Sequence, residues 1–214
     1  MGVSGMWVIG GMDEKHVTEL APRFHSVVAT HAARPDRQAA WRAWCDGQAL
    51  VPGLFPDTRP GYANMVAPHT AVAAFHALAG DMPWDDPGAE DLDVLRGDIY
   101  DDGVKGFCVV VRKGSPVAAL FHGIGPARAQ LLPGWFGNFL LAPDEVMALR
   151  SQVEGALAIP VGERSVVLER VRDWLNGMGD SGDEDAEDLL DGPLRCFREA
   201  AGGGLGLCGS QTWV

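Results

Sequence analysis

Short apolar runs near both ends of this 214-residue chain predict strands that come together in one sheet. The first run, Met6–Ile9, is closed by two glycines. The tail from Leu205 to Val214 is apolar again, so we expect it to return to the sheet as a strand. A third run, Phe107–Val111, is rich in the residue types that favour strands, and its Cys108 is expected in the core.

Several segments between these runs carry apolar residues at helical spacing. One begins at Asp13 and is expected to end near Pro22, because proline breaks a helix interior. Ala118–Phe121 suits either a strand or a short helix, and Leu131–Leu141 is expected to form a loop and then a strand. The other predicted helices are 35–46, His69–Ala79, Pro143–Leu157, Glu163–Leu175 and Leu189–Ala201.

Apolar runs typical of strands and segments with helical spacing together predict a chain of mixed helix and strand. The length favours one domain over residues 1–214. A proline-rich loop is expected at 51–63 and a solvated acidic segment at 179–188. The acidic segment either links to the last helix or begins it, since carboxylates favour a helix N-terminus.

The charge balance is strongly one-sided. Asp and Glu number 29 against 17 Lys and Arg, which gives a formal net charge of −12. Nucleic-acid binding needs clustered basic residues, so this composition argues against nucleic acid as a partner. Acidity keeps a protein in solution, and it also steers a basic protein partner toward the surface.

Other features of composition favour a cytoplasmic protein that does not enter a membrane. The first residues lack the basic start of a signal peptide, and no apolar stretch has the length that a membrane helix needs. The four cysteines are scattered, as is typical of reduced thiols in the cytosol.

Two strings resemble functional motifs but lack the structural context that each motif needs. GLGLCG, from Gly204 to Gly209, matches the dinucleotide-binding pattern, yet the chain has no room for the helix that must follow it. GDSG, from Gly179 to Gly182, lies in an acidic polar run without the surroundings of a serine nucleophile. The sequence therefore predicts no cofactor and no metal.

Histidines are the best candidates for acid–base chemistry. His69 and His76 lie seven residues apart on one predicted helix, which is too far for a shared metal but close enough to line one wall of a pocket. With His122, and with Asp98 or Asp101 as carboxylate partners, they form the candidate catalytic set. The alternative is that each is an ordinary buried or half-buried histidine.

Loop aromatics are the best candidates for binding. Trp84 in MPWDDPG and Trp135 in PGWFGN lie in predicted loops, where aromatic side chains often anchor interfaces and pockets. Arg128 is a third candidate binding residue. The alternative for the tryptophans is packing over the edge of the core.

The order of several segments resembles the YfbM-like proteins, a bacterial family of unknown function. HTAVAAFHALAGD, at 69–81, is similar to that family's central helix, with Phe75 where the family tends to have Trp. The segment GPARAQLLPGWFGNFLLAPDEVMALRSQVEGAL, at 125–157, is similar to a family segment, with an insertion between Arg128 and Leu140. LLDGPLRCFREAAGGGLGL, near the end, and GVSGMWVIGGMDEKHVTEL, at the start, are similar to the family's closing and opening segments. The resemblance implies one α+β domain with a mixed sheet covered by several helices, and it implies no activity.

Two functions fit these observations. The first is a non-catalytic interaction or accessory protein, for example one that neutralises a toxin or serves a biosynthetic system. The alternative is a small enzyme with a histidine-lined pocket that uses acid–base catalysis.

Overall fold

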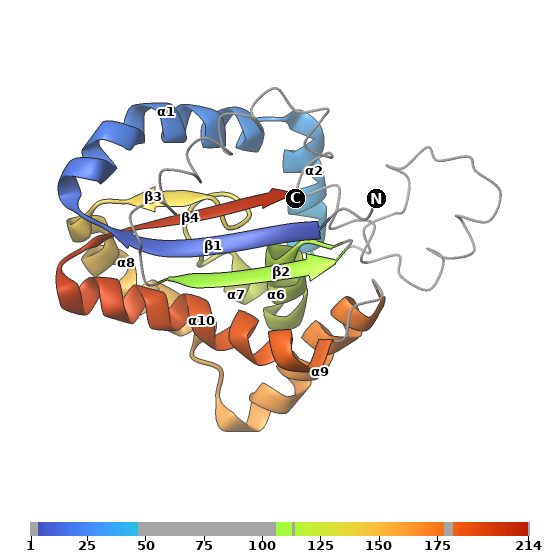
Figure 1. Cartoon of the computed structure of the whole chain (residues 1–214). Coiled ribbons are helices and arrows are strands. Elements are labelled where there is room, and N and C mark those ends of the chain that lie inside the picture. Colours follow the sequence, from blue (N-terminus) through green and yellow to red (C-terminus); the bar gives the residue numbers. More distant parts are fainter. Residues whose placement is uncertain (1–3, 47–105, 113, 178–181, 214) are drawn as a thin grey trace.

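A four-stranded antiparallel sheet forms the centre of the protein in this computed structural model, which describes residues 4–46, 106–112, 114–177 and 182–213 (Figure 1). The strands lie in the order β2-β1-β4-β3. Their bounds are β1 Ser4–Met12, β2 Phe107–Arg112, β3 Phe139–Leu141 and β4 Gly206–Trp213.

Helices cover both faces of this sheet, which confirms the α+β class (Figure 1). Helix α1 lies over β3 and β4 on one face, while α6, α8 and α10 pack on the other, with α9 behind them. Among the described residues all three strand pairings are antiparallel, where a mixed sheet was expected. Strand direction depends on the path of long helical connections, which the hydrophobic pattern does not encode. The helices are α1 Glu14–Ala32, α2 Pro35–Cys45, α6 Pro116–Ile124, α7 Pro126–Ala129, α8 Pro143–Leu157, α9 Val161–Gly177 and α10 Gly182–Gly203.

The first and last strands of the described chain pair at the middle of the sheet. The prediction that the tail returns as a strand is confirmed by β4, which pairs with β1 from Gly5↔Trp213 to Met12↔Gly206. Gly10 and Gly11 lie inside β1 and do not close it, contrary to expectation. Both glycines stay in the strand because they pair with β4, Gly10 with Cys208 and Gly11 with Leu207.

Helix α1 continues through Pro22 to Ala32, so the expected end at proline was wrong. The side chain of Asp13 caps its start by accepting from the backbone N–H of His16 at 2.8 Å. Pro22 is exposed, so water can satisfy the carbonyl that loses its helical partner. Val17 and Phe24 are both buried on the sheet, one on each side of the proline, and this packing holds the helix together.

Other predicted elements agree closely with the structure. Helix α8 has the predicted bounds, α2 and β2 match theirs within a residue, and Ala118–Phe121 is helical. Helix α10 begins at Gly182 and not at Leu189, as the second reading of the acidic segment allowed. Ala186 is fully buried, which explains why these first turns stay helical. The predicted loop at 51–63 and helix at 69–79 lie outside the described residues.

Cys108 is exposed, so its expected place in the core was wrong. Strand β2 alternates strictly, with Phe107, Val109 and Val111 buried and the residues between them exposed. The run of apolar letters concealed this two-residue period. Within the part of the chain that the structure describes, no helix is long and apolar enough to cross a membrane.

Candidate functional site

A cleft of about 320 Å³ opens where α2, α6, α7 and the loop before β3 meet. We call it the aromatic cleft, because four of its ten lining residues are aromatic. Its lining residues are Gln38, Trp41, Phe121, Ala129, Gln130, Leu132, Pro133, Gly134, Trp135 and Phe136.

Trp41 on α2 lies at the centre of the aromatic side chains. Its ring centroid is 5.9 Å from that of Trp135, 5.6 Å from Phe136 and 6.1 Å from Phe121. The rings are tilted or edge-on to one another, the arrangements that aromatic quadrupoles favour. The ring of Trp44 lies tilted against the same ring with centroids 5.2 Å apart, since residues three apart on a helix share a face. The cleft wall is therefore a set of rings that hold one another in place.

The loop that carries Trp135 has an unusual backbone. Gly134 and Gly137 have φ of 74° and 78°, and Phe136 has φ of 45° although it is not glycine. Left-handed backbone costs a non-glycine residue about 1–3 kcal/mol, so surrounding contacts must hold this turn. Trp135 and Asn138 close the turn with two backbone hydrogen bonds of 2.9 Å.

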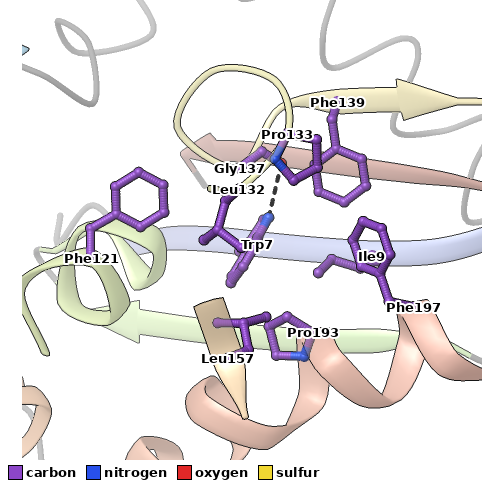
Figure 2. Close-up of a pocket in the computed structure, with 10 residues that line it drawn as sticks. All are labelled: Trp7, Ile9, Phe121, Leu132, Pro133, Gly137, Phe139, Leu157, Pro193 and Phe197. Atoms are coloured by element: carbon purple, nitrogen blue, oxygen red, sulfur yellow. Dashed lines mark hydrogen bonds between the residues drawn. The ribbon is translucent and has the colours of Figure 1, made fainter. Parts of the chain in front are cut away.

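The underside of this loop faces the core, as Figure 2 shows. There the indole N–H of Trp7 donates to the carbonyl oxygen of Gly137 at 3.0 Å. The space beside this bond is only about 20 Å³ and is walled by apolar side chains from β1, β3, α8 and α10. It is a packing gap and not a ligand site, but Phe121, Leu132 and Pro133 line both it and the aromatic cleft.

Polar groups in the aromatic cleft are few. Gln38 donates through Nε2 to the carbonyl oxygen of Ala32 at 2.6 Å, and Gln130 donates likewise to Pro126 at 3.1 Å. Among the described residues, neither amide oxygen has a hydrogen-bond donor. The indole N–H of Trp135 is buried, and no acceptor for it lies within the described ranges. The lining chemistry is thus aromatic and aliphatic faces with amide groups at the edge.

Of the predicted binding residues, Trp135 lies in the aromatic cleft. Arg128 does not line it and is already engaged. It donates to the carbonyl oxygens of Gly155 and Ala156 at 3.0 and 3.4 Å, and pairs with Glu163 at 3.0 Å. These contacts join α7 to the end of α8 and the start of α9. Trp84 and the candidate catalytic residues His69, His76, Asp98 and Asp101 lie outside the described residues.

His122 is the one candidate catalytic residue that the described ranges include, and it lies between α6 and α9. Its ring packs at a tilt against Trp174 with centroids 5.4 Å apart, and His122 is not among the residues that line the cleft. Burial lowers the pKa of His122 below its ordinary value, and the nearby Arg170 lowers it further, while Asp173 opposes the change. A lowered pKa favours the neutral ring at pH 7, so His122 suits packing against an indole.

The lowered pKa predicts that His122 makes folding depend on pH. In the unfolded chain the ring binds a proton near pH 6.5, whereas the folded protein resists it. The contribution of the neutral His122 ring to the free energy of unfolding is therefore fully present above pH 6.5 and is lost as the pH falls below it. We expect the wild type to lose more stability than His122→Gln between pH 8 and pH 5.5, measured by urea unfolding. Equal losses in both proteins would contradict the direction of the shift.

Several cleft residues had not been singled out from the sequence. They include Phe121 and Phe136, and the two glutamines Gln38 and Gln130. The glycines flanking Trp135 and Phe136 were the available signal, since a close pair of glycines in a loop favours left-handed turns.

Among the described residues, no three His, Cys, Asp or Glu side chains gather where they could hold a metal ion. Comparison with known proteins found no matching family model, no matching curated protein and no matching solved structure.

Proposed function

We propose that this protein is a non-catalytic interaction protein that binds a partner through the aromatic cleft. The observation that carries the proposal is the ring cluster around Trp41, which presents Trp135 and Phe136 on a fixed turn beside an open volume of about 320 Å³. Rigid tryptophans of this kind are the side chains that most often dominate binding energy.

The lining favours an apolar or aromatic segment of the partner. Aromatic rings and the aliphatic side chains of Leu132 and Pro133 gain by excluding water, and the described lining contains no charged residue. The amide oxygens of Gln38 and Gln130 suit N–H groups of a peptide backbone. Such a lining binds and orients and does not move protons at neutral pH.

The acidity of the protein favours a basic partner. A net charge of −12 would steer a basic protein toward the molecule, and the cleft would then hold one of its apolar segments. Within that proposal the protein is cytoplasmic, is related to the YfbM-like family, and neutralises a toxin or serves as an accessory subunit. A histidine-based enzyme has no support from the position of His122.

A displayed random peptide library tests the proposal without knowledge of the natural partner. The full-length protein is immobilised, bound peptides are selected, and their Kd values are measured by calorimetry. We expect selected peptides to be rich in apolar residues and to bind Trp135→Ala at least about 30-fold more weakly, the effect of losing a hot spot of 2 kcal/mol.

Two further variants make this experiment specific. Gln130→Ala changes an exposed cleft side chain without disturbing the ring cluster, and we expect a several-fold loss of affinity. Met147→Ala removes an exposed apolar side chain from α8, outside the cleft, and should leave the Kd unchanged. Failure to select any peptide, or equal binding to wild type and Trp135→Ala, would sink the proposal.

A further inference from the structure

We infer that Asn138 is a positioning residue that sets the orientation of Trp135 and Phe136 in the aromatic cleft. The inference rests on the proposed function, because positioning matters only if the cleft binds. Asn138 follows the left-handed turn directly and does not line the cleft itself.

The Asn138 carboxamide satisfies three backbone groups at once. Its Nδ2 donates to the carbonyl oxygens of Trp135 at 3.2 Å and Phe136 at 3.3 Å. Its Oδ1 accepts from the backbone N–H of Gln211 at 2.9 Å. One side chain therefore ties the peptide groups of both cleft aromatics to the strand β4.

The Gln211 contact replaces a missing piece of the sheet. Pairing between β3 and β4 ends at Phe139↔Gly209, because the chain turns away before Phe139. The Gly137 carbonyl is directed to the Trp7 indole instead of to β4. In β4 the backbone N–H of Gln211 therefore donates to the Asn138 side chain, in the place where a regular strand would offer it a backbone carbonyl.

The anchor on β4 is itself fixed. The Gln211 side chain is buried and accepts through Oε1 from the Ser115 hydroxyl, and Ser115 caps the start of α6 by accepting from Ala118 N–H at 3.1 Å. Asn138 thus connects the cleft loop to the central sheet, which is tied in turn to the helix that supplies Phe121.

The chemical demand at this position is specific. The site needs one acceptor and two donors within the reach of a short side chain, which a carboxamide provides. A carboxylate of the same shape keeps the acceptor but loses both donors, and it faces two carbonyl oxygens. Asn138→Asp should therefore release the turn, while the core beneath it keeps its apolar packing.

The coupling between the Trp41 and Trp135 indoles, 5.9 Å apart, gives a direct spectroscopic test without a ligand. Two indoles this close, with ring planes 60° apart, produce an exciton couplet in circular dichroism, and Trp135→Phe defines the part that this pair contributes. We expect Asn138→Asp to lose at least half of that part while it still unfolds in one cooperative transition. The matched control is Gln152→Glu, the same amide-to-carboxylate change in an exposed side chain that bonds the Leu131 carbonyl before the turn, and it should keep the couplet.

The outcomes separate this inference from the proposed function. A full couplet in folded Asn138→Asp overturns the inference, even if selected peptides still depend on Trp135. A lost couplet supports it, even if no peptide binds the wild type and the proposed function fails. If Asn138→Asp does not fold, the uncharged Asn138→Ala carries the same measurement. Unfolding of both variants would also overturn the inference, since Asn138 would then support the fold as a whole.

Discussion

Replacing Trp7 by alanine is expected to lower the free energy of unfolding by about 4 kcal/mol, the usual cost of removing a buried tryptophan. Trp7 is 2% exposed and packs edge-on against Phe107 with ring centroids 5.3 Å apart. Its removal leaves a cavity between β1 and the helices and deprives the Gly137 carbonyl of its donor (Figure 2). The effect is large because packing and hydrogen bonding are lost together.

Trp7→Phe divides this loss into its parts. Phenylalanine keeps most of the buried apolar area but has no N–H, so we expect a loss of about 1–3 kcal/mol, the cost of an unpaired buried carbonyl. Urea unfolding at pH 7.5, followed by far-ultraviolet circular dichroism, measures both variants. A loss below about 1.5 kcal/mol for Trp7→Ala would show that the loop and core relax around the cavity.

Replacing Gly137 by alanine should cost about 2–4 kcal/mol, from backbone strain and overpacking together. The φ of Gly137 is 78°, which an L side chain resists. A Cβ there would lie 2.5 Å from Cγ2 of Val117 and 2.7 Å from Nε1 of Trp7. The loop can make room only by moving away from Trp7, so Trp135 would also move away from Trp41.

Gly155 provides the matched control for this substitution. It lies within α8, its backbone is helical, and a Cβ there would meet nothing within 4 Å. Gly155→Ala should therefore raise stability by about 0.4–1 kcal/mol, because it restricts the unfolded chain. Urea unfolding measures the change in the free energy of unfolding for both variants. We expect a decrease for Gly137→Ala and an increase for Gly155→Ala, and a change in the same direction would refute strain and contact as the cause at Gly137.

The sequence was a good guide where a local rule and the tertiary contacts agree. Pro143–Leu157 forms a helix with the predicted bounds, because Pro143 suits a first turn and Val146, Val153 and Leu157 share one buried face. It was a poor guide where packing overrides a local rule. Pro22 did not end α1, since Val17 and Phe24 pack on both sides of it.

The candidate site was only partly visible in the sequence. Trp135 stood out because a tryptophan between loop glycines has little local reason to be there. Trp41 comes from a helix about 90 residues earlier, and only the tertiary fold places their rings 5.9 Å apart. The role of Asn138 was invisible, because all its side-chain bonds go to backbone groups whose positions the letters do not give.

The pairing of β1 with β4 has a consequence for how a cell makes this protein. Gly5 lies opposite Trp213, so the middle of the sheet cannot close until nearly the whole described chain has been synthesised. At ribosomal rates of about 5–20 residues per second, the nascent β1 waits roughly 10–40 s for its partner. Throughout that time the edge of β1 that pairs with β4 stays open, and an open strand edge is a template for pairing with another chain. Chaperone binding to β1 is therefore most valuable for this fold before β4 has been synthesised.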